Sequence, residues 1–326
     1  MSKRAATNFD ETPTPMTSNI DVDNVSVSVS VPSDPPNVPS AISTMSLAAL
    51  KAELNQTGSL VLIRRTFPIS SRKPDVSKLA RGFRLRAKAR LDSMLKRSDA
   101  DIKVAAKAWC EDAEAAREIY GPISIWNTSE VTSMKGLFCA DDEDVGKAAK
   151  QFNEDISRWD VSNVTTMRVM FEGASAFNGD LSSWDVSNVT TMQGMFYEAE
   201  AFNCELSSWE VSNVTTMEEM FEGASAFSGD LSSWEVSNVT TMELMFRDAS
   251  AFNGDLSAWD VSNVTTMEQM FAFTSAFNGD LSTWNISNVT TMRAMFHQAK
   301  AFSKDTIKDW TLEGKDLGKG LLENPY

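Results

Sequence analysis

The sequence predicts an α/β repeat solenoid, because one phrase recurs almost unchanged at a fixed period. Nearly the same letters, WDVSNVTTM, then MF two residues later, then AFNGDLSS, fill each interval of 25 residues. One interval is too short to bury its own apolar face, so each must stack on its neighbours. We therefore expect about seven 25-residue coils, each with a short strand and a short helix, over residues 126–302. The tryptophans that mark the period are Trp159, Trp184, Trp209, Trp234, Trp259 and Trp284.

Each coil contains a stretch with helical spacing and a stretch with alternating spacing. Met167, Met170, Phe171 and Ala174 stand at i, i+3, i+4 and i+7, which indicates one buried stripe of a short helix. A threonine precedes the stripe and, in the middle coils, an acid or amide follows it three residues later, as in a capping box. Residues 181–186, with Leu, Trp and Val separated by polar residues, indicate a short strand.

Stacking turns identical positions into ladders along the array. The interior ladders are expected to hold the tryptophans, methionines and phenylalanines, with coils roughly 4.8 Å apart. A ladder of asparagines is expected to bond backbone groups of the adjoining coil. Its members are Asn163, Asn188, Asn213, Asn238, Asn263 and Asn288.

The copies of FNGDLSSWDVSNVTTM, with the MF that follows, resemble the leucine-rich-repeat-like modules of BspA-type surface proteins, also catalogued as a mycoplasma repeat of unknown function. The resemblance covers roughly residues 126–302. The lead-in from residue 108 to residue 138 is similar to the segment that often precedes such arrays. The resemblance implies a binding or adhesion solenoid without a shared enzymatic activity.

Charge divides the 326-residue chain into a basic front and an acidic remainder. Residues 1–100 carry 15 Lys and Arg against 9 Asp and Glu, whereas the other residues carry 15 against 36. An acidic array disfavours nucleic acid as a direct partner and leaves proteins, cations and neutral glycans. The composition divides the chain into a disordered tail (1–44), a basic, partly helical linker (45–99), a helical cap (100–125), the repeat solenoid (126–302) and a C-terminal cap (303–326).

The basic region, residues 64–97, has apolar residues that can share one helix face. Its two interpretations are a helix that contacts an acidic surface and a solvated linker neutralised by the array. The acidic, proline-rich N-terminus is unlike a signal peptide, and no stretch has the length of a membrane span. A cytoplasmic location is therefore expected, with a cell-surface or secreted location as the alternative if the sequence is incomplete.

The chain lacks the residue patterns of catalytic and metal sites. His297 is the one histidine, the three cysteines have no metal-ligand spacing, and no phosphate loop or nucleophile motif is present. We therefore expect no enzyme, no cofactor and no metal. The alternative for the acidic rows is calcium binding, against solvation. The alternative for the repeated NVT sequons is glycosylation, against a structural ladder.

The function that follows is a noncatalytic protein-interaction or adhesion module. Its partner is expected to bind the positions that vary between coils, and its oligomeric state stays open. The alternatives are a structural or water-ordering solenoid, such as an ice-binding surface, and a calcium-dependent one. The candidate interaction positions are Gln193, Gly194, Glu218, Glu219, Glu243, Leu244, Glu268 and Gln269.

Overall fold

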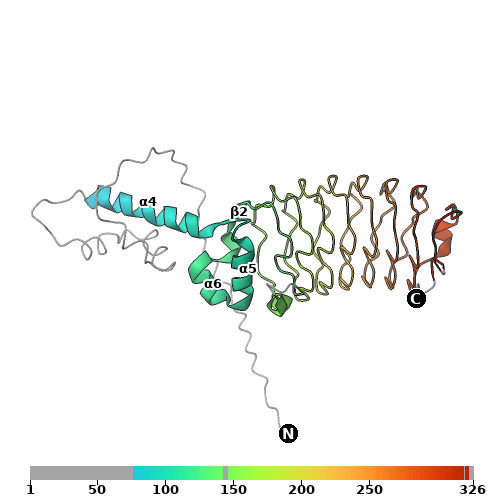
Figure 1. The fold of residues 1–326 in the computed structure, drawn as a ribbon, viewed down its shortest axis with the longest axis horizontal. Helices are drawn as coiled ribbons and strands as arrows, with labels where there is room; N and C mark the ends of the chain where they lie inside the picture. Colours follow the sequence, from blue (N-terminus) through green and yellow to red (C-terminus); the bar gives the residue numbers. More distant parts are fainter. Residues whose placement is uncertain (1–75, 142–145, 319, 323–326) are drawn as a thin grey trace, which may run out of the picture. The chain divides into compact units, whose positions relative to one another are not determined.

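The computed structural model describes residues 76–141, 146–318 and 320–322, all within the second of two compact units, Ala41–Tyr326. The tail expected at 1–44 and the first part of the linker lie outside the described residues. In chain order the elements are helix α4 (Val76–Leu95), strand β1 (Lys96–Ser98), helices α5 (Ile102–Glu111) and α6 (Ala113–Tyr120), the 3-10 turn η1 (Ile123–Ile125), strand β2 (Asn127–Glu130) and the 3-10 turns η2 (Gly146–Gln151) and η3 (Lys304–Ile307) (Figure 1).

From β2 onward the chain runs as successive coils, and equivalent residues of neighbouring coils are joined in parallel (Figure 1). The Thr190 amide donates to the Thr165 carbonyl of the preceding coil at 2.9 Å. In residues 167–173 and their equivalents, alternate amides donate to carbonyls of the following coil instead. An example is the bond from Val169 to the Gln193 carbonyl at 2.8 Å. The seven bridges join, in order, Ser133, Thr166, Thr191, Thr216, Thr241, Thr266, Thr291 and Asp316.

The short helix and short strand expected in each coil are not formed in the described coils, which consist of turns joined by these single bridges. The alternate amides that bond the next coil are unavailable for the i to i−4 bonds of a helix. The remaining amides close turns, as from Met170 to the Met167 carbonyl at 3.1 Å. Two residues per coil, such as Val169 and Gly173, have left-handed backbone angles that end each turn.

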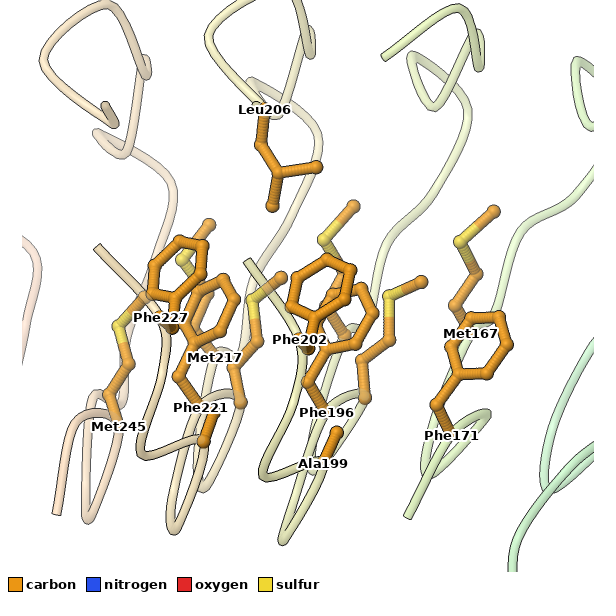
Figure 2. Close-up of a cluster of buried hydrophobic side chains, with 14 of the residues drawn as sticks. Met167, Phe171, Phe196, Ala199, Phe202, Leu206, Met217, Phe221, Phe227 and Met245 are labelled. Carbon is orange, nitrogen blue, oxygen red and sulfur yellow. The ribbon is translucent and has the colours of Figure 1, made fainter. Parts of the chain in front are cut away.

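The interior is a set of parallel ladders of aromatic rings. Phe171 and Phe196 of neighbouring coils stack with centroids 5.6 Å apart and planes 1° apart, and Trp234 and Trp259 do so at 6.4 Å. Within a coil, Phe196 stacks on Phe202 at 3.8 Å, and Figure 2 shows this pair and the pair of Phe221 and Phe227 with methionine side chains beside them. Each repeat tryptophan also donates its indole N–H to a backbone carbonyl of the preceding coil, so burial leaves no polar atom of the ring unpaired.

The N-terminal end of the array is covered by two helices, α5 and α6, within the range 100–125 where a helical cap was expected. Asp112 divides them, because its extended backbone ends α5 and its carboxylate accepts from the first amides of α6. Trp109 of α5 packs edge-on against Trp126 at 6.0 Å, which begins the tryptophan ladder. Strand β1 pairs in parallel with β2, which lies just before Ser133, where the row of bridges begins.

Each end of the ladder is completed by a charged side chain. Asp99 accepts from the amides of Thr132 and Ser133 at 2.8 and 3.1 Å, the place that a preceding coil would fill with a carbonyl. At the other end, the Lys315 ammonium donates to the carbonyls of Ile286 and Val289, both at 2.8 Å. The Asp99 contact satisfies backbone amides that the first coil would otherwise leave unpaired, and Lys315 adds a charged donor to carbonyls of the last coil.

Candidate functional site

One surface of the array carries exposed polar rows whose residue type barely changes, and we call it the constant face. A row here is a set of residues spaced 25 apart. In the asparagine row, Asn213 donates its side-chain amide to the Ser187 carbonyl of the preceding coil at 2.7 Å. In the threonine row, the Thr215 hydroxyl donates to the Thr190 carbonyl at 3.1 Å. The asparagine bond recurs from Asn163 to Asn288.

The threonine contact corrects the capping box expected at these positions. A capping threonine accepts from an amide of its own helix, whereas Thr215 donates to another coil. The neighbouring Thr216 hydroxyl lies 3.5 Å from the Glu218 amide, which closes a local turn. The acid three residues after the threonine is therefore not part of a cap. It stands at a position whose residue type changes from coil to coil.

The aspartates of the acidic rows on the constant face form local turns. Asp185 accepts from the amide and the hydroxyl of Ser187, at 3.1 and 2.6 Å, and these hydrogen bonds hold the pKa of its carboxyl below the usual value. Asp160 and Asp260 accept in the same way from Ser162 and Ser262. Within the described residues, no group of three or more His, Cys, Asp or Glu side chains could hold a metal ion.

The repeated sequons have a structural role in this geometry. The nitrogen to which a glycan would be attached is the same Nδ2 that donates to the neighbouring coil, as in Asn238, which bonds the Ser212 carbonyl at 2.8 Å. Glycosylation would replace one of its two amide hydrogens with a sugar, in a row where neighbouring asparagines lie only one coil apart.

A second surface, which we call the variable face, contains four rows that change from coil to coil. These rows carry eight carboxylates and three arginines, so the face is acidic. The first row is Arg168, Gln193, Glu218, Glu243, Glu268 and Arg293, and the second is Val169, Gly194, Glu219, Leu244, Gln269 and Ala294. The third is Glu172, Tyr197, Glu222, Arg247, Ala272 and His297, and the fourth is Gly173, Glu198, Gly223, Asp248, Phe273 and Gln298.

The eight candidate interaction positions all belong to the first two rows. Six of them are half-buried, whereas Gly194 and Gln269 are buried. The second row adopts left-handed backbone angles in every coil from Val169 to Ala294. The third and fourth rows, which the sequence did not single out, complete this surface.

Electrostatic repulsion is concentrated at the centre of the variable face. Burial, followed by the charges of Glu268 and Glu218, raises the pKa of Glu243, and burial with Glu218 raises that of Glu219. Burial raises the pKa of Glu222 to about 7, although Arg247 donates to it at 2.6 Å and offsets part of the effect. The face therefore favours a cationic surface opposite it.

The coil of Trp259 interrupts the pattern and creates a hollow. Phe273 has a φ of 62°, in a row where other coils have Gly, Glu, Asp or Gln, and it is 36% exposed. The His297 ring meets it edge-on at 5.0 Å, and the Arg247 guanidinium lies 5.8 Å from its centroid. The hollow is lined by Asp248, Phe273, Ser275, His297, Gln298 and Lys300.

His297 was noted from the sequence only as the one histidine, and Phe273 was not singled out. The available signal was the letters FAFTSAF, where the other coils read FEGASAF or close to it. Thr274 replaces the usual alanine and donates from its buried hydroxyl to the Phe246 carbonyl at 2.5 Å. A departure from an otherwise fixed repeat therefore marks this coil.

Among the helices of the described residues, none is long and apolar enough to cross a membrane. Comparison with known proteins identifies a family but no individual relative: no curated protein and no solved structure matches the chain. The family profile matches residues 111–234 and 215–317, which together include more than half of the sequence. The chain belongs to the family described as Mycoplasma protein of unknown function, DUF285.

Proposed function

We propose that the array is a noncatalytic protein-recognition module and that the variable face binds the partner. The observation that carries this proposal is the division between the two faces. The repeating polar residues of the constant face have hydrogen-bonding roles between or within coils, as Asn213 and Asp185 illustrate. The residues of the variable face differ in charge and size from coil to coil, which such a role would not require.

The chemistry of the variable face favours a protein partner. It combines carboxylates, arginines, Tyr197 and the exposed Phe273, a mixture typical of protein interfaces with charged rims and aromatic anchors. The resemblance to BspA-type surface modules supports the same class of function and extends it to adhesion if the protein reaches the cell surface. The solenoid is the architecture that we propose for presenting this surface, since stacked repeats create extended binding faces.

Site-specific photo-crosslinking in the native cells tests this proposal. A photoreactive amino acid at Glu243 lies on the variable face, and the matched control carries it at Glu210, an exposed acid on the constant face. We expect discrete crosslinked proteins from position 243 and not from position 210. The same products from both positions, or none from position 243, would contradict recognition through the variable face.

A further inference from the structure

Helix α4 presents an exposed basic stripe with one leucine at its centre. The helix carries six Lys and Arg residues and one Asp, a net charge of +5. Arg81, Leu85 and Lys88 are exposed and lie at i, i+4 and i+7, so they share one face. Leu85 is 52% exposed, whereas Ala87 is fully buried.

The variable face carries the complementary features. Its four rows have eight carboxylates against three arginines, a net charge of −5 with the histidine neutral. Phe273 is the exposed large apolar residue of this face. Glu268 belongs to the same coil as Phe273, and Asp248 belongs to the preceding coil. Phe273 also keeps a left-handed backbone, which is unfavourable for a bulky side chain and in other coils is left to Gly or a polar residue.

We propose that α4 of one copy of this chain docks on the variable face of a second copy, with Leu85 against Phe273 in the hollow. Arg81 and Lys88 then face the carboxylates beside it. This inference rests on the proposed function and names a second copy as the partner. Among the described residues, Leu85 and Phe273 are both partly exposed, and the charges of the two surfaces are opposite and equal in size.

The neighbours of Phe273 favour an aliphatic side chain over a sugar ring. A pyranose needs an open aromatic face, but the Arg247 guanidinium lies over the ring and the His297 imidazole meets it edge-on. A leucine requires only a partly exposed ring and room beside it, which the hollow provides. Within one copy, α4 packs against α6 and leads directly into β1 at the opposite end of the repeats from Phe273.

Sedimentation equilibrium of the full chain over a range of concentrations tests the docking. We expect the average mass to rise with concentration at an ionic strength of about 0.05 M and the association to weaken at about 0.5 M, where the charges are screened. A closed dimer would show reciprocal docking, and larger species would show head-to-tail docking; both support the proposal. A mass that stays that of one chain at every concentration overturns it.

Two single variants and their mixture make the test specific. Leu85→Asp and Phe273→Asp should each weaken association at least about tenfold. Aspartate fits the backbone at position 273, because Asp248 has a φ of 58° in the same row. The control Ile119→Asp replaces an apolar residue on α6 that is more exposed than Leu85 and should leave association unchanged.

Mixing the two variants should restore association, because one retains an intact α4 and the other an intact hollow. Association that survives both variants, or a mixture that stays as weak as its components, overturns the docking. The same holds if docking occurs within one chain, since mixing would then restore nothing. A monomeric chain that still crosslinks a different protein from position 243 would refute self-docking and leave recognition by the variable face standing.

Discussion

The constant and variable faces are built from the same coils, yet one repeats almost letter for letter while the other changes in charge and size. On the constant face, Asn213 and Thr215 bond backbone carbonyls of the preceding coil, so a substitution breaks a contact between coils. On the variable face, the recurring contacts between coils are backbone hydrogen bonds, and the side-chain bond of Arg247 to Glu222 joins one pair of coils only. In a repeat array, therefore, an invariant exposed residue can be structural, and a varied one is the better candidate for recognition.

The largest loss of stability is expected from the interior, which both faces share. Trp234→Ala should cost roughly 3–5 kcal/mol of unfolding free energy, because it removes a buried ring stacked on Trp209 and Trp259 and leaves a cavity. Chemical denaturation should show the loss as a lower midpoint. Unfolding of a repeat array need not be two-state, so the midpoint should be compared by fluorescence and circular dichroism. An unchanged midpoint would place the tryptophan row outside the stabilising core.

Removing the contact that completes the first end should have the next largest effect. Asp99→Ala leaves the amides of Thr132 and Ser133 without their carboxylate acceptor and should cost about 1–2 kcal/mol. Partial burial raises the pKa of Asp99, but these hydrogen bonds outweigh it and hold the pKa below the usual value. The stabilisation is therefore complete above about pH 4 and disappears as pH falls through the lowered pKa.

Denaturation of wild type and Asp99→Ala at pH 7 and near pH 3 measures that dependence. The difference between the two proteins should shrink at the lower pH. Asp92→Ala, an exposed aspartate on α4, is the control and should change little at either pH. An equal difference at both pH values would exclude the carboxylate as the stabilising group.

A ladder contact on the constant face should matter less. Asn213→Ala removes the bond to the Ser187 carbonyl and should cost about 0.5–1.5 kcal/mol. Glu210→Ala on the same face is the control, because glutamate is too long for the turn that aspartate forms there, and its loss should be near zero. If both substitutions lowered the free energy of unfolding equally in urea denaturation, the hydrogen bond would not explain why asparagine recurs in this row.

The smallest effect should come from the variable face. Glu243→Gln should change stability by less than about 0.5 kcal/mol, with any change toward greater stability at pH 7. Burial and the neighbouring carboxylates raise the folded-state pKa of Glu243, so its charged form opposes folding above the unfolded pKa of about 4.3. The difference should vanish below that pH. A clear loss of stability at pH 7 would show that Glu243 has a structural contact.

The period, the interior and the ladders follow from the sequence because identical letters 25 residues apart must face identical neighbours. Asn213 and Trp234 are examples, since their environments are copies of those one coil away. The local backbone conformation of each coil did not follow from the sequence. The spacing of Met167, Met170 and Phe171 fits a helix, but it equally fits a chain of turns that buries every third or fourth residue.

What the sequence by itself determined is the repeat, its length and the division between fixed and varied positions, because these depend only on comparing copies. The tertiary structure decided which backbone groups bond within a coil and which bond between coils, and hence that turns replace the helix. It also decided that Phe273, Arg247 and His297 come together around one hollow. Those three residues belong to three successive coils, so only the stacking of the coils brings them into contact.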